Sequence, residues 1–225
     1  MLYLALSCLQ GRLMQSAAQE LLDLKIQGLQ LTPGLFPTND FKSWLARKKT
    51  NYLTHHGFSW YKYNTSVWNK TADCLVASNS IHPPKSNSPP GKIWKQKAED
   101  GDYQDFILET MYPEYHLGNS KDLIWAMDNQ FRLAVDVSHI YIQLQSGSLS
   151  DAVWRRLQQY EHIKELHLSS NNGRVDIHQP LTKNTFGLDW AKERSRDGIP
   201  VVLECYMHRL SDSERLEQIK IAGIE

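Results

Sequence analysis

Short apolar runs and longer amphipathic segments alternate along most of the chain. The apolar runs lack the strict every-second-residue pattern of a half-exposed sheet, and turn residues bound them. This pattern is typical of parallel strands that are covered on both faces. Eight such runs predict strands at Leu2–Ser7, Gly28–Thr32, Thr50–His55, Cys74–Ile81, Phe106–Thr110, Arg132–Asp136, Ile163–Leu168 and Pro200–Cys205.

Segments with helical periodicity lie between most of these runs, and several start at a capping residue. Two stretches break the alternation. Residues 58–69 are rich in aromatic side chains without a clean helical period, and residues 85–101 are rich in Pro, Ser, Lys and Gly, which predicts a long loop with at most one helical turn. The predicted helices are Gln15–Leu24, Asn39 or Asp40 to Arg47, Ser120–Asn129 capped by Ser120, Ser150 or Asp151 to Tyr160, Asp189–Arg196, and Ser211 or Ser213 to Ile221.

Strands and helices in this alternation predict an α/β fold, specifically a (β/α)8 TIM barrel that closes on itself and leaves no sheet edge open. We expect residues 1–225 to form a single domain, since the length suits one barrel. The chain is shorter than the typical barrel of about 250 residues. We therefore expect a compact form with shortened helices after strands three and four.

The composition of the chain limits its expected partners and its expected cellular compartment. Lys plus Arg and Asp plus Glu both number 25, so no overall positive field draws nucleic acid to the molecule. Cys8, Cys74 and Cys205 fit no disulfide framework, which favours a reducing interior. The apolar start, residues 1–6, lacks basic residues and is too short to span a bilayer. We expect a cytoplasmic protein that does not bind membranes, and the sequence does not indicate its oligomeric state.

Histidines and carboxylates follow the predicted strands, at the end of the barrel where enzymes of this fold place their active sites. A single histidine at a strand end is more often a hydrogen-bonded core residue than a metal ligand. Glu109 and Glu204, however, follow apolar runs, where an unpaired carboxylate would be costly to bury. A cation would balance all of these groups at once. The predicted metal ligands are His55 (or its neighbour His56), His82, Glu109, Asp136, His139, His167, Asp176, His178 and Glu204.

The segments that carry these residues resemble the xylose-isomerase-like barrel superfamily, and within it most closely the endonuclease IV type of apurinic endonuclease. They run in the order that this family uses, and the Asp-x-x-His and Val-Asp-x-His steps are the most specific. The matching segments are Thr54-His55-His56-Gly57-Phe58, Ile81-His82-Pro83, Ile107-Leu108-Glu109, Val135-Asp136-Val137-Ser138-His139, Leu166-His167-Leu168, Arg174-Val175-Asp176-Ile177-His178 and Val202-Leu203-Glu204.

The resemblance implies a site with three zinc ions, in which Glu109 bridges two of them. Mn²⁺ or Fe²⁺ would also suit a mixture of imidazole and carboxylate ligands. It also implies that His55 rather than His56 is the ligand, since Phe58 then falls where the family has an aromatic residue. Carried over, the ions would be held by His55, His82 and Glu109; by Glu109, Asp136, His167 and Glu204; and by His139, Asp176 and His178.

The function expected from this site is metal-dependent hydrolysis of a phosphoester, because several ions together can activate water and stabilise both oxygens of a displacement at phosphorus. Glu109, Glu204 and Asp176 are the predicted catalytic carboxylates. Arg174 is a candidate contact to an anionic substrate. Trp60 and Tyr61 are candidates for stacking on a base or a substrate ring, although such aromatic residues can also cover a barrel where a helix is missing.

The chain also departs from the endonucleases it resembles. It is shorter, residues 7–12 lack their glycine-rich pattern, and Ile177 stands where they usually carry Arg. Nucleic acid, a small phosphoester, a modified sugar or a peptide therefore all remain candidate substrates. A sugar (phosphate) isomerase or epimerase with one divalent ion, an iron-dependent oxidoreductase acting on a peptide or small biosynthetic substrate, and a barrel that only binds a partner are the alternative functions.

Overall fold

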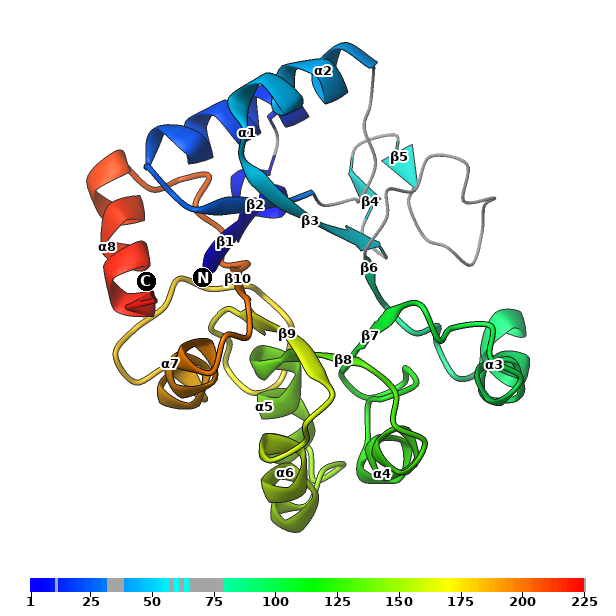
Figure 1. Cartoon of the computed structure of the whole chain (residues 1–225). Helices are drawn as coiled ribbons and strands as arrows, with labels where there is room; N and C mark the ends of the chain where they lie inside the picture. The colour runs from blue at the N-terminus through cyan, green and yellow to red at the C-terminus, as the bar shows by residue number, and fades with distance from the viewer. Residues whose placement is uncertain (11, 32–38, 57–58, 61–62, 65–78, 225) are drawn as a thin grey trace.

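Eight parallel strands close into a barrel in the computed structural model, which describes residues 1–10, 12–31, 39–56, 59–60, 63–64 and 79–224 (Figure 1). The strands follow one another around the barrel in chain order, and the last pairs with the first, Leu2 opposite Val201. The predicted fold class is thus confirmed. The barrel strands are β1 (Leu2–Ala5), β2 (Gly28–Leu31), β3 (Asn51–His56), β6 (Asn79–Ile81), β7 (Ile107–Glu109), β8 (Leu133–Asp136), β9 (Ile163–Leu168) and β10 (Val201–Leu203).

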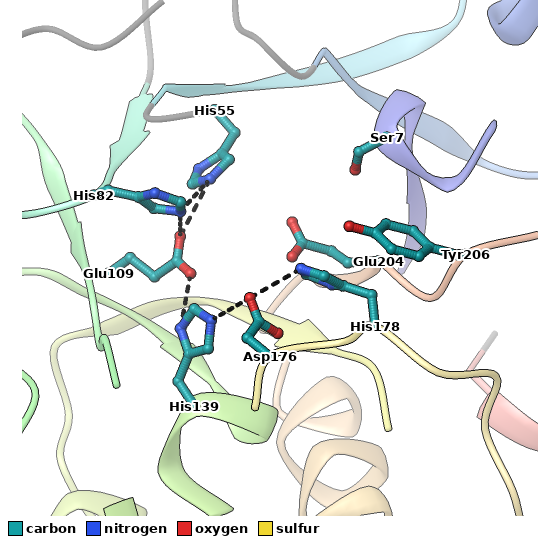
Figure 2. Close-up of a pocket in the computed structure, with 9 residues that line it drawn as sticks. All are labelled: Ser7, His55, His82, Glu109, His139, Asp176, His178, Glu204 and Tyr206. Atoms are coloured by element: carbon teal, nitrogen blue, oxygen red, sulfur yellow. Dashed lines mark hydrogen bonds and ion pairs between the residues drawn. The ribbon is translucent and has the colours of Figure 1, made fainter. Parts of the chain in front are cut away.

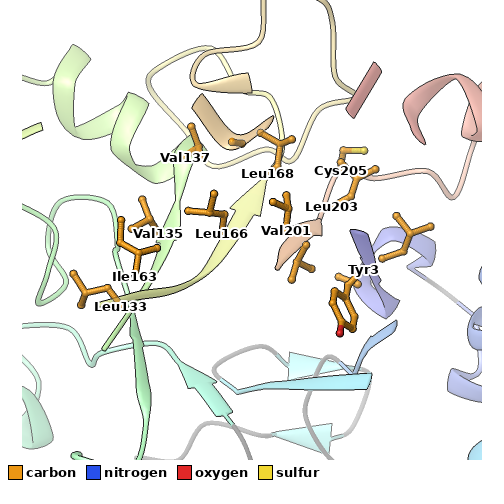
Figure 3. Packing of buried hydrophobic residues seen from close by; sticks show 14 of the residues in the cluster. Tyr3, Leu133, Val135, Val137, Ile163, Leu166, Leu168, Val201, Leu203 and Cys205 are labelled. Carbon is orange, nitrogen blue, oxygen red and sulfur yellow. The ribbon is translucent and has the colours of Figure 1, made fainter. Parts of the chain in front are cut away.

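Helices lie around the outside of the barrel (Figure 1). They cover the apolar outward faces of the strands, so that Val135, Leu166 and Leu203 are completely buried between sheet and helices (Figure 3). No helix in the described part of the chain is both long and apolar enough to cross a bilayer. The helices are η1, a 3-10 turn (Leu6–Leu9), α1 (Met14–Asp23), α2 (Asn39–Lys48), α3 (Pro89–Glu99), α4 (Ser120–Asp128), α5 (Val137–Gln145), α6 (Asp151–Gln158), α7 (Leu188–Arg196) and α8 (Asp212–Ala222).

The predicted loop at residues 85–101 is wrong, because α3 fills most of it, and so is the predicted shortening of the helix after strand four. Ser88 accepts a hydrogen bond from the backbone N–H of Gly91 and caps the helix, while Pro89 occupies the first turn, where proline is tolerated. Trp94 is fully buried and stacks on His116 with ring centroids 4.8 Å apart. The Pro and Gly residues therefore mark the start of a helix and not a break.

Helix α5 was also missed, since no helix was expected between Asp136 and Ser150. It carries apolar and β-branched residues on several sides, which hides the helical period. Asp136 ends β8 and at once begins α5, because its Oδ1 accepts hydrogen bonds from the backbone N–H groups of Ser138 (2.7 Å) and His139 (2.9 Å). Similarly, Asn119 rather than Ser120 caps α4, through a bond from the N–H of Asp122.

The segment after β3 contains two short antiparallel strands, β4 (Ser59–Trp60) and β5 (Tyr63–Asn64). The other residues between β3 and β6 lie outside the described part of the structure, so the predicted shortening of the helix after strand three stays a prediction. Tyr61 and the side chain of Trp60 lie outside the described part of the structure, so their predicted role in stacking stays a prediction. The same holds for residues 74–78 of the predicted fourth strand.

Close contact between β1 and β2 leads to a testable expectation for stability. Gly28 lies opposite Tyr3, and a methyl group at Gly28 would overlap the Tyr3 ring. We expect Gly28→Ala to lower the free energy of unfolding by about 1–3 kcal/mol, the usual cost of overpacking a core. Urea denaturation would measure this. The double variant with Tyr3→Leu should regain part of the loss, and an undiminished loss would mean that the ring is not the cause.

Candidate metal centre

The nine side chains predicted from the sequence to bind metal converge at the carboxyl-terminal end of the barrel. Each lies within 3.7 Å of another member, although they come from six different strands and the segments that follow them. Three subsets have ligand atoms close enough to share an ion: His55, His82 and Glu109; His55, His167 and Glu204; and Glu109, Asp136 and His139. Figure 2 shows Glu109 between the His55–His82 pair and His139.

Distances within the cluster are close to those between ligand atoms on a shared cation. Two ligand atoms on one tetrahedral zinc ion lie about 3.3–3.5 Å apart, because bonds from zinc to nitrogen or oxygen are about 2.0–2.2 Å long. The Nε2 atoms of His55 and His82 lie 3.3 and 3.2 Å from Oε2 of Glu109. At the other side of the cluster, Oδ2 of Asp176 lies 3.2 Å from Nε2 of His139 and 3.1 Å from Nε2 of His178.

Several buried atoms of the cluster also lack a hydrogen bond. Buried polar atoms are normally paired, since an unpaired one costs free energy. Six cluster atoms have no hydrogen-bond partner among the described residues: Oε2 of Glu109, Oδ2 of Asp136, Nε2 of His139, Nδ1 of His167, Oδ1 of Asp176 and Nδ1 of His178. Each is an oxygen or imidazole nitrogen of the type that binds divalent metals, so the residues present fit metal ions.

Local structure explains why His55 and His139 face the cluster. His55 is only 2% exposed, and its Nε2 lies 3.3 Å from Oε2 of Glu109, so His55 is part of the cluster. His139 sits in the first turn of α5, which Asp136 caps. Its Nδ1 donates to the carbonyl oxygen of Thr110 (2.8 Å), which leaves the lone pair on Nε2, toward Asp176.

The loop after β9 places Asp176 and His178. It is closed by two backbone hydrogen bonds between Ser170 and Gln179, of 2.9 and 2.7 Å. Asn171, a possible ligand by its position, instead holds the loop, because its Nδ2 donates to the carbonyl of Ser138 and its Oδ1 accepts from the N–H of Gly173. The fixed loop thus presents two ligand-type residues to the barrel.

Burial and neighbouring charges move the pKa values of the cluster in opposite directions. Burial alone would raise the pKa of Glu109, but His82, His167 and His55 outweigh it and hold that pKa well below its usual value. Burial raises the pKa of Glu204 to about 7. Burial opposes a charge on His139, yet Asp136 and Asp176 raise its pKa well above the usual value. Positive charge, on protonated histidines or on bound cations, would therefore stabilise this group of buried carboxylates.

A small cavity opens among these residues, with a volume of about 30 Å³, on the scale of one or two water molecules. Ser7 and Tyr206 also line it, on the side away from His82 (Figure 2). Sequence reasoning missed both, although Ser7 follows β1 and Tyr206 follows Glu204, positions at strand ends that could have drawn attention. Arg174 is exposed at the surface and is not part of the lining.

Sequence reasoning also missed three buried polar residues deeper inside the barrel, Gln30, Ser80 and Glu165. Gln30 and Glu165 contact His167, and Ser80 contacts His55. A signal for Glu165 was present, since it lies two residues before His167 and so shares its face of the strand.

No protein-family model matches the chain, and comparison with curated proteins finds no match either. The fold and the site define the class nevertheless: a parallel β/α barrel with buried groups of histidine and carboxylate that could hold metal ions at its catalytic end. Such a site suggests a metal-dependent enzyme.

Proposed function

We propose that the protein is a hydrolase of the endonuclease IV type, with a multinuclear site of three zinc ions, and that it acts on a phosphoester. The observation that carries the proposal is the way the nine side chains divide into ligand groups around Glu109. An isomerase that uses one ion would need only Glu109, Asp136, His167 and Glu204. It would leave His82, Asp176 and His178 without a role, whereas these three lie within the same cluster.

The contacts support three ion positions. Glu109 is central because its Oε2 lies near His55, His82 and His167, while its Oε1 lies 3.4 Å from Nδ1 of His139. His167 Nδ1 lies 3.5 Å from Oε1 of Glu204. The residues that would hold the three ions are His55, His82 and Glu109; Glu109, Asp136, His167 and Glu204; and His139, Asp176 and His178.

Bound zinc ions would supply an activated water near neutral pH and would stabilise the charge that develops on the attacking and leaving oxygens. Glu109, which is 1% exposed, would be a ligand shared by two of the ions. Glu204 and Asp176, which line the cavity, would orient water there. Arg174, exposed on the loop after β9, would meet the anionic substrate. The substrate itself must stay at the mouth, since the cavity is small.

Two measurements on the purified protein test the proposal. Elemental analysis should find about three zinc ions per chain, and the zinc-loaded protein should cleave a duplex that carries an abasic site, with cleavage lost after chelation and regained when zinc is restored. About one ion per chain would favour the isomerase, and iron with visible colour after anaerobic purification would favour the oxidoreductase. If the protein binds three ions but leaves the abasic duplex intact, the proposal of a multinuclear hydrolase stands, and DNA with an abasic site is excluded as its substrate.

A further inference from the structure

Beneath the metal ligands, a set of polar side chains crosses the interior of the barrel. It consists of Gln30 on β2, Ser80 on β6 and Glu165 on β9, which we name the interior relay. Gln30 and Ser80 are completely buried, and Glu165 is 2% exposed. None of the three lines the cavity where substrate would enter. A buried carboxylate is costly unless it is hydrogen-bonded, so this position needs an explanation.

Oε1 of Glu165 collects three donors. Nε2 of Gln30 donates at 2.7 Å, Oγ of Ser80 at 3.1 Å, and Nε2 of His167 lies 2.7 Å away. A carboxylate oxygen only accepts hydrogen bonds, so the 2.7 Å contact requires a proton on Nε2 of His167. Nε2 of Gln30 also lies 3.2 Å from the same nitrogen, and one of its two protons is donated to Glu165.

Glu165 thereby fixes the tautomer of His167. With the proton on Nε2, the lone pair is on Nδ1, which points away from the relay. Nδ1 lies 3.3 Å from Oε2 of Glu109 and 3.5 Å from Oε1 of Glu204, among the groups that would share its ion. A ligand histidine is typically fixed in this way by a carboxylate on its other nitrogen.

Oε1 of Glu165 also fixes the tautomer of His55, through the hydroxyl group of Ser80. The hydroxyl of Ser80 has one proton, and it goes to Glu165. Oγ must then accept from Nδ1–H of His55, at 3.0 Å, so the lone pair of His55 is on Nε2. That nitrogen lies 3.0 Å from Nε2 of His82 and 3.3 Å from Oε2 of Glu109. One buried carboxylate thus orients ligands of two different ion positions.

We propose that Glu165 is a positioning residue that selects the metal-binding tautomers of both His55 and His167. This inference rests on the metal site of the proposed function. It also explains the sequence locally, since Glu165 and His167 are two residues apart on β9 and share the inner face of the barrel. Glu165 would not touch the substrate or the ions, and its effect would pass through the two histidines.

Glu165→Gln tests the proposal, because it removes the charge of the side chain and keeps nearly the same shape. An amide can offer the ring either its oxygen or its NH₂ group, so the preference for a proton on Nε2 of His167 is lost. We expect zinc affinity, measured by competition with a chelator, to fall about ten- to hundredfold, the usual effect of removing such a partner. Nitrogen-15 NMR of the metal-free protein, recorded at a pH high enough to leave the His167 ring neutral, should show a changed proton position on His167. Lys164→Gln, the exposed neighbour on the same strand, should match the wild type in both measurements.

Ser80→Ala separates the two effects of Glu165, because it removes the link from Glu165 to His55 and leaves the contact between Glu165 and His167 in place. We expect it to weaken the ion held by His55 and His82 while the tautomer of His167 stays as in the wild type. This smaller change also keeps the test available if Glu165→Gln does not fold. Wild-type affinity together with an unchanged His167 tautomer in Glu165→Gln would overturn the positioning role alone. A wild-type protein that binds no zinc would instead overturn the proposed function, and this inference with it.

Discussion

Glu109→Gln is expected to reduce phosphoester hydrolysis by about 10²- to 10³-fold, the usual effect of removing one preorganised electrostatic group from an active site. The substitution keeps the shape of the side chain but removes the charge that His55, His82 and His167 face. Two ion positions should lose their shared ligand, so elemental analysis should find no more than about one zinc ion per chain. Single-turnover cleavage with excess zinc would separate lost metal from lost chemistry.

The matched control is Glu217→Gln, the same chemical change at an exposed position on α8. It should keep the zinc content and the rate of the wild type. Full zinc content and full activity in Glu109→Gln would show that Glu109 does not bridge ions. A normal zinc content with lost activity would assign Glu109 to the reaction and not to metal binding.

Between about pH 5 and 8, we expect the stability of the metal-free protein to fall as pH rises, whereas the stability of the zinc-loaded protein should rise. Glu204 has its pKa raised to about 7 by burial, so the folded metal-free protein holds this proton more tightly than the unfolded chain does. Its contribution to stability is complete below the usual carboxyl pKa and is lost as pH rises toward 7. His139 and His167, whose pKa values are also raised, act in the same direction at higher pH.

The zinc-loaded protein should behave in the opposite way, because histidine must lose its proton before it binds a metal. Its melting temperature should rise over the same range. That of the chelated protein should fall by about 5–10 °C, given about 3 kcal/mol for Glu204 alone. Differential scanning calorimetry at matched ionic strength would measure both curves. Glu204→Gln should flatten the curve of the chelated protein, and parallel curves for the two forms would refute the assignment of these residues to a metal.

The sequence predicted the barrel because each buried strand is a short apolar run, and β9 was found with its exact bounds. The convergence of the ligands also followed from the sequence, since parallel strands deliver their carboxyl ends to one rim. Helices α3 and α5 were missed for physical reasons. The first begins with Pro and Gly residues that resemble a loop, and the second is apolar on too many sides to show a period.

Gln30 and Ser80 of the interior relay could not be predicted from the sequence, for a different reason. Whether Gln30 or Ser80 faces the inside or the outside of a barrel depends on the register of neighbouring strands, which a single sequence does not contain. The contact between Ser80 and Glu165 joins residues 85 positions apart. Residues that only position the predicted ligands are therefore harder to predict from the sequence than the ligands themselves.

The closed loop between Ser170 and Gln179 has one more consequence. Its backbone hydrogen bonds, and the bond from Asn171 to the carbonyl of Ser138, hold Asp176 and His178 in place without help from an ion. An incoming cation therefore has little chain to order, and the entropic cost of capture is low. Such preorganisation should therefore favour tight binding of the ion.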